Sequence, residues 1–230
     1  MTILNATLTA DSLTVSQDMA HCHPGGTLVE YAPKVITRPN RRMVAASAGN
    51  SAFAVELAAT LDTLPRLDLD QIAAGLRNLH GAHAEQVVIV GWWEELLGLP
   101  LAYVFQAEGG FAPQQIQPGA GHVISPAEAL FEDRAAMLVM SVAATQGQDV
   151  EGFHVALALA QREAARRGLI DKPGWGSQSI GGKLTIARLD RNGVHRRNLD
   201  IFGDQIASHK HNTAGDVLAA RWALHPAAAA

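Results

Sequence analysis

The chain has 230 residues, 48% of them apolar and 17% charged, and its 18 basic and 22 acidic residues give a formal net charge of −4. This length suits one compact domain that needs no disulfide or structural metal, and the sequence holds a single cysteine. A net negative chain without a Lys/Arg stripe is not expected to bind nucleic acid. With neither a signal-peptide pattern nor an apolar run near the roughly 20 residues that span a bilayer, we expect a soluble, cytoplasmic protein.

The first residues predict a β-hairpin. β-favouring residues lie on both sides of the turn signal Asp11-Ser12. Strand pairing across this turn would put Thr2 opposite His21, with Asp18 within a few residues of Thr2.

The elements that follow alternate between strands and pairs of helices. Strands are expected at 27–31, 34–37, 43–49, 86–93, 101–106, 111–116, 184–189 and 194–199. Helices are expected at 51–64, 69–79, 127–145 and 149–167. This order favours two sheets with helices packed outside them, a layered α+β or α/β sandwich. We expect residues 1–207 to form the domain and residues 208–230 to form a tail.

Thr2 offers the first reactive group. Removal of Met1 would leave Thr2 with a hydroxyl and a free α-amine on one residue. The α-amine has a reference pKa of about 7.7 to 8.0, so a substantial fraction is neutral near pH 7 and can take the hydroxyl proton, directly or through a water. Such a threonine is a nucleophile with its own base. A threonine after the initiator methionine is common, so the hypothesis depends on the register of Asp18 and Lys34.

The positions of Thr2, Asp18 and Lys34 resemble those of the proteasome-type N-terminal threonine hydrolases, nearest to the HslV-like branch. The betaproteobacterial proteasome homologue is the alternative branch. The run at 45–49 is similar to the Ala-Gly-x-x-Gly segment that leads from a buried strand into the first helix of that family. The resemblance is specific over residues 2–57 and implies a four-layer αββα sandwich of the N-terminal-nucleophile hydrolase type.

The resemblance also implies a role for each matching residue. Thr2 would be the nucleophile, Lys34 would stabilise its alkoxide, and Asp18 would orient the lysine. Ser125 would help to order the nucleophile amine. Ala46, which stands where the family usually has glycine, would supply the backbone N–H of the oxyanion hole.

Two further residues, Cys22 and Ala48, would lie on the segments that bind the substrate backbone. A small buried thiol is an equally good interpretation of Cys22. A zinc site at His21-Cys22-His23 is not expected, because neighbouring residues of a strand point to opposite faces. The sequence implies no metal and no cofactor.

The leading functional hypothesis is a self-compartmentalising threonine peptidase. It would cleave peptides or unfolded proteins inside a homo-oligomer of two stacked rings of six or seven subunits, with an ATP-dependent unfoldase as a partner. Two alternatives stay open at this point: an N-terminal-nucleophile amidase acting on small molecules, and a catalytically silent ring subunit.

Overall fold

Among the residues that the structure describes, the strands of the computed structural model form two antiparallel five-stranded sheets and a small two-stranded one. The structure describes residues 2–22, 28–49, 51–79, 86–119, 121–125, 150–166 and 180–203. The first sheet has the order β10 (Gly121–Ser125), β1 (Leu4–Leu8), β2 (Ser12–Asp18), β11 (Leu184–Asp190), β12 (Gly193–Leu199). The second has the order β5 (Ile36–Arg38), β6 (Met43–Ala48), β7 (Val87–Glu94), β8 (Leu99–Gln106), β9 (Gln114–Gln115). The short pair is β3 (Ala20–Cys22) with β4 (Leu28–Tyr31).

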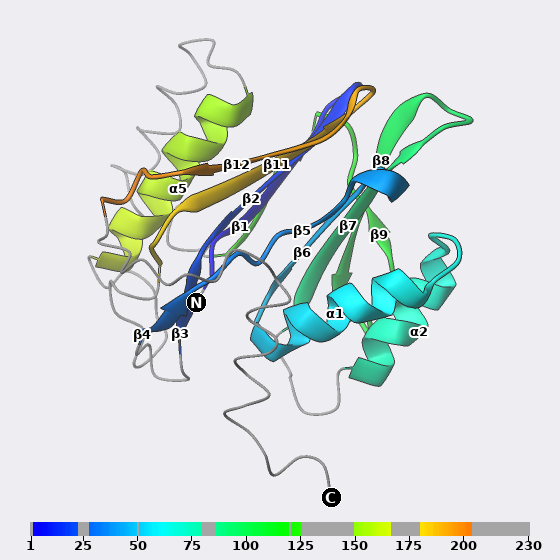
Figure 1. The fold of residues 1–230 in the computed structure, drawn as a ribbon, viewed down its shortest axis with the longest axis horizontal. Coiled ribbons are helices and arrows are strands. Elements are labelled where there is room, and N and C mark those ends of the chain that lie inside the picture. The colour runs from blue at the N-terminus through cyan, green and yellow to red at the C-terminus, as the bar shows by residue number, and fades with distance from the viewer. Residues whose placement is uncertain are drawn as a thin grey trace, which may run out of the picture.

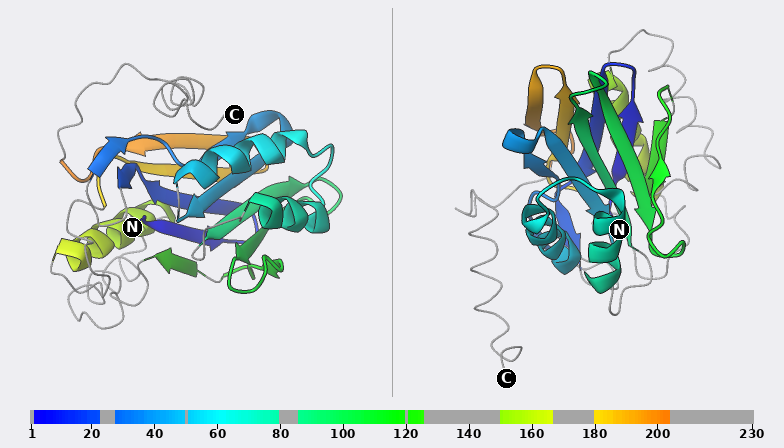
Figure 2. Two further views of the ribbon diagram at one scale, coloured as in Figure 1. Left: turned by 90° about the horizontal axis from the view of Figure 1, so that it is seen from below. Right: turned by 90° about the vertical axis from the view of Figure 1, so that its right-hand side faces the viewer.

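The two large sheets pack face to face, with helices on their outer sides. Buried apolar residues of both sheets share one core, among them Leu4, Leu13, Val44 and Ile89. The helices α1 (Ser51–Thr63) and α2 (Leu69–Leu79) pack on the second sheet, and α5 (Val150–Arg166) packs on the first. Figure 1 shows α5 beside β11 and β12, on the opposite side of the strands from α1 and α2. The left view of Figure 2 shows the same separation.

This arrangement agrees with the predicted α+β class, a core of two sheets with helices outside. The helices expected at 51–64, 69–79 and 149–167 are found as α1, α2 and α5. The helix expected at 127–145 and the tail at 208–230 lie outside the described residues. Among the described residues, one outer side thus carries the helix pair α1 and α2, and the other carries α5.

The register of the first hairpin differs from the prediction. Leu8 pairs with Leu13, and the Thr9 N–H donates to the Ser12 carbonyl at 2.8 Å, so the turn lies at Ala10 and Asp11. The predicted pairing of Thr2 with His21 is wrong by two residues. Because side chains alternate along a strand, a shift by two leaves every side chain on the face that the prediction gave it.

The residue that follows β6 has to be a glycine. Gly49 has a φ of +126°, and an added Cβ would overlap the side-chain amide of Gln86. Only glycine combines this backbone conformation with so close a neighbour. Gly49 follows the last residue of β6, and α1 begins at Ser51.

Within the described ranges, no helix is both long enough and apolar enough to cross a membrane.

Candidate active site

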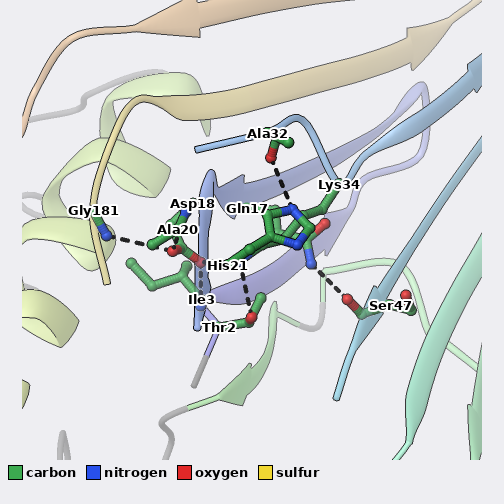
Figure 3. A network of polar contacts seen from close by, with 10 residues as sticks. All are labelled: Thr2, Ile3, Gln17, Asp18, Ala20, His21, Ala32, Lys34, Ser47 and Gly181. Atoms are coloured by element: carbon green, nitrogen blue, oxygen red, sulfur yellow. Dashed lines mark hydrogen bonds and ion pairs between the residues drawn. The ribbon is translucent and has the colours of Figure 1, made fainter. Parts of the chain in front are cut away.

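Three strand ends bring Thr2, Asp18 and Lys34 together. Thr2 stands just before β1, Asp18 is the last residue of β2, and Lys34 lies in the segment that leads into β5. The Lys34 Nζ is 3.0 Å from the Thr2 Oγ1 and 3.3 Å from the Asp18 Oδ1 (Figure 3). Residues far apart in the sequence thus form one continuous polar contact, from carboxylate to ammonium to hydroxyl.

The three side chains are enclosed by the protein. Thr2 is 8% exposed, Lys34 is 7% exposed and Asp18 is fully buried. A buried ammonium is costly unless anions or hydrogen-bond acceptors surround it. In this site Asp18 supplies the opposite charge and Thr2 an acceptor oxygen, so the ammonium is held where it can influence the hydroxyl.

Backbone N–H groups hold the Asp18 carboxylate in place. The N–H of Ile3 donates to Oδ1 at 2.8 Å, and the N–H groups of Ala20 and Gly181 donate to Oδ2 at 3.1 and 3.4 Å. Burial raises the pKa of Asp18, while Lys34 and the N–H groups of Ile3 and Gly181 lower it. The carboxylate is therefore a fixed group that orients Lys34 and the start of β1.

The loop before β11 reaches the site through a glycine. Gly182 has a φ of +78°, and a Cβ there would lie 2.6 Å from Tyr31 and 3.1 Å from Met19. The Met19 N–H also donates to the Gly181 carbonyl at 3.1 Å. This loop therefore contacts the site through its backbone, by the N–H and the carbonyl of Gly181.

The structure places two further predicted residues by their backbone alone. Ser125 ends β10 and pairs with Leu4, so it lies beside the strand that Thr2 precedes. Cys22 ends β3 and pairs with Leu28. Their roles toward the nucleophile amine and the substrate stay predictions.

The edge of β6 determines which backbone groups face the site. The Trp93 N–H donates to the Arg42 carbonyl at 3.0 Å, and bonding directions alternate along an antiparallel ladder. The N–H groups of Ala46 and Ala48 are therefore directed toward β7, and those of Ser47 toward the side of β5. Because β5 starts at Ile36, opposite Ala45, it leaves β6 open at Ser47, next to the segment of Lys34.

Sequence reasoning missed Gln17 and the polar residues under α5. The Gln17 Nε2 crosses between the sheets and donates to the Ser47 carbonyl at 2.6 Å (Figure 3). The available signal was alternation, because Leu13, Val15 and Gln17 occupy the same face of β2 and two of them belong to the core.

Under α5, buried polar side chains bond the helix to the outer face of the first sheet. His154 contacts Ser16 through Nδ1 at 2.7 Å and Thr7 through Nε2 at 3.0 Å. Gln161 and Asn5 exchange two amide hydrogen bonds of 2.8 and 2.9 Å. These contacts fix the helix against β1 and β2, the two strands that lead to Thr2 and Asp18.

The described part of the chain holds no group of three or more His, Cys, Asp or Glu side chains that could bind a metal ion.

Comparison with known proteins gives a likeness in fold only. No protein-family model and no curated protein matches the sequence. Among solved structures, the chain is similar to a Gly-1 mutant of Anbu from Hyphomicrobium sp. strain MC1, with a TM-score of 0.61 and 13% identity over 98% of this chain and 99% of that one. At this identity the likeness shows a shared fold and no activity.

This likeness corrects the branch expected from the sequence. The prediction of an HslV-like chain is wrong, because the solved structure found to align with 98% of this chain is a mutant of Anbu. Matching spacings of Thr2, Asp18 and Lys34 do not separate branches, since they describe only the ends of three strands.

Proposed function

We propose that the chain is a threonine peptidase of the N-terminal-nucleophile type, built as a four-layer αββα sandwich, with Thr2 as the nucleophile. The observation that carries the proposal is the Lys34 ammonium, 3.0 Å from the Thr2 hydroxyl and backed by the buried Asp18 carboxylate. An ammonium beside a hydroxyl lowers the energy of the alkoxide that forms during attack.

The chemistry requires the Thr2 amine to be free, so Met1 has to be removed. Lys34 donates a hydrogen bond to Oγ1, which leaves the hydroxyl proton for the neutral α-amine, directly or through a water. Oγ1 attacks the substrate carbonyl, and the proton passes from the amine to the leaving nitrogen as the C–N bond breaks. A water then hydrolyses the ester on Oγ1 with the amine as base, which restores Thr2.

The oxyanion formed during this attack needs a backbone donor. The ladder directs the N–H of Ala46 toward β7 and that of Ser47 toward the open side of β6. We therefore assign the donor to this edge, with Ser47 better placed than the Ala46 expected from the sequence. Ser125 is assigned to ordering the amine, and the segments of Cys22 and Ala48 to contacting the substrate backbone.

The proposal includes assembly into two stacked rings of six or seven subunits in the cytoplasm, with an ATP-dependent unfoldase delivering unfolded proteins. Such a chamber would keep a simple nucleophile away from folded proteins. Leu159, 42% exposed on the Ala-rich helix α5, offers an apolar contact between subunits. Native mass spectrometry should show a ring-sized species that Leu159→Arg breaks into smaller ones and that Thr2→Ala leaves intact. A parent monomer would favour the small-molecule amidase.

The test of the chemistry is hydrolysis of a fluorogenic peptide amide by the parent and two variants. Thr2→Ala should abolish turnover and leave the native mass unchanged, because the side chain stands at the edge of the core. Thr2→Ser should retain part of the activity, since the hydroxyl and the amine both survive. Intact mass should show the parent without Met1.

Turnover by Thr2→Ala at the level of the parent would reject the nucleophile. A parent that retains Met1 and hydrolyses no amide substrate would favour the silent ring subunit.

A further inference from the structure

The side chain of Gln17 is an amide in a position that its strand otherwise gives to apolar residues. It is fully buried, and its Nε2 donates to the Ser47 carbonyl at 2.6 Å. Its Oε1 is buried and accepts no hydrogen bond within the part of the chain that the structure describes. A buried acceptor left without a donor is costly. The unpaired amide oxygen of Gln17 therefore indicates that a ligand donates a hydrogen bond to it.

The strand register puts this amide beside Thr2. Gln17 pairs with Leu4, and Thr2 stands two residues before Leu4, on the same face of the sheet by alternation. Diagonal neighbours on one face have Cα atoms roughly 7 to 8 Å apart, which a glutamine side chain can span. Thr2 is only 8% exposed, so a substrate that reaches its hydroxyl has to come close to this neighbouring amide.

The partner of Gln17 lies on the open edge of β6. An extended peptide that adds to a sheet edge uses the N–H and the C=O of the same edge residue, here Ser47. The Gln17 Nε2 already occupies the Ser47 carbonyl. The Oε1 of the same Gln17 amide, which has no partner among the described residues, offers a substrate N–H an acceptor next to that carbonyl.

We propose, building on the peptidase function above, that Gln17 binds the substrate backbone. Its Oε1 accepts one backbone N–H of an extended peptide while its Nε2 keeps the bond to Ser47, so the amide stands between the substrate and β6. The site then selects peptides with a secondary amide at one fixed distance from the cleaved bond.

The experiment uses fluorogenic peptide amides that are N-methylated at one backbone nitrogen each, away from the cleaved bond. In the parent, methylation at one position should lower kcat/KM more than at the others. Gln17→Met keeps the length of the side chain without its acceptor, and it should reduce that penalty by about three- to tenfold, the range of one net hydrogen bond. Thr14→Val removes a buried hydroxyl of β2 that also has no partner among the described residues, so it should leave the penalty unchanged.

An equal penalty in the parent and in Gln17→Met would overturn the proposal. So would a parent with no sensitive position, a result that does not depend on how well the variant folds. If Thr2→Ala is inactive and the methylation penalty is the same in the parent and in Gln17→Met, only this inference fails. If Thr2→Ala is active, the proposed function itself fails.

Discussion

The strands β1 and β2 carry two buried polar clusters that differ in charge. The cluster at the strand ends joins an ammonium, a carboxylate and a hydroxyl: Lys34, Asp18 and Thr2. The cluster under α5 consists of neutral groups, with His154 bonded to Ser16 and Thr7 and Gln161 paired with Asn5.

The difference in charge suits the two clusters to different tasks: the neutral cluster holds a helix in place, and the charged cluster can take part in chemistry. Neutral donors and acceptors that satisfy each other fix a helix at little electrostatic cost. A buried charge pair is often no more stable than an apolar replacement, so its presence at the end of two strands is weak evidence for a role in stability. The charged cluster is the one that can stabilise an alkoxide, and the neutral cluster keeps its strands in place.

The largest effect is expected from Lys34→Met, which keeps the alkyl stem and removes the charge. Peptide hydrolysis should fall by about a hundredfold or more, the scale of one electrostatic stabiliser. Stability should also fall, by about 3 to 5 kcal/mol in urea unfolding, because the buried Asp18 carboxylate loses its partner.

The control is the double variant Asp18→Asn/Lys34→Met. It contains no buried charge, so it should recover much of the stability lost in Lys34→Met and none of the hydrolysis. Activity that returned together with stability would show that the lysine acts through the fold. A single variant as active as the parent would make Lys34 a structural residue.

The sequence predicted the charged cluster better than the neutral one, for a physical reason. Thr2, Asp18 and Lys34 stand at strand ends, where spacing along the chain decides position, and the structure brings them together. Their catalytic roles are still untested. The helices α1 and α2 were predicted because apolar residues at helical spacing lie between clear breakers.

The neutral cluster could not be predicted from the pattern. His154 and Gln161 are polar, as residues on the solvent-exposed face of a helix usually are. In β1 and β2, polar residues alternate with apolar ones, as they would in a sheet with one face exposed to solvent. Only tertiary packing shows that α5 covers them. The hairpin register was predicted wrongly because the sequence fits a turn at Ala10-Asp11 as well as one at Asp11-Ser12. The hydrogen bonds between Thr9 and Ser12 show that the turn lies at Ala10-Asp11.

A second prediction concerns the pH dependence of stability. Burial lowers the pKa of His154 from 6.5 to about 4. The unfolded chain therefore binds a proton at this residue between pH 6.5 and pH 4 while the folded chain does not, so stability is complete above pH 6.5 and is lost as the pH falls. The loss due to His154 should reach about 3 kcal/mol near pH 4.

The measurement is urea unfolding at pH 7 and pH 4. His154→Gln cannot take up a proton and should lose less stability between the two pH values than the parent. His195→Gln, at a residue whose side chain is 57% exposed, should behave like the parent. Equal losses in the parent and in His154→Gln would show that the histidine is solvated when the protein is folded.

The smallest effect is expected from the Gln161–Asn5 pair, and it tests the division between the clusters most directly. Gln161→Leu leaves the buried Asn5 amide without its two bonds, which should cost about 1 to 3 kcal/mol. Asn5→Leu/Gln161→Leu removes both partners and should recover much of that loss. Hydrolysis per folded molecule should match the parent in both variants, since Thr2 and Lys34 are untouched. If kcat fell in the double variant while stability recovered, α5 would be setting the position of Thr2 through β1, and the neutral cluster would belong to the site after all.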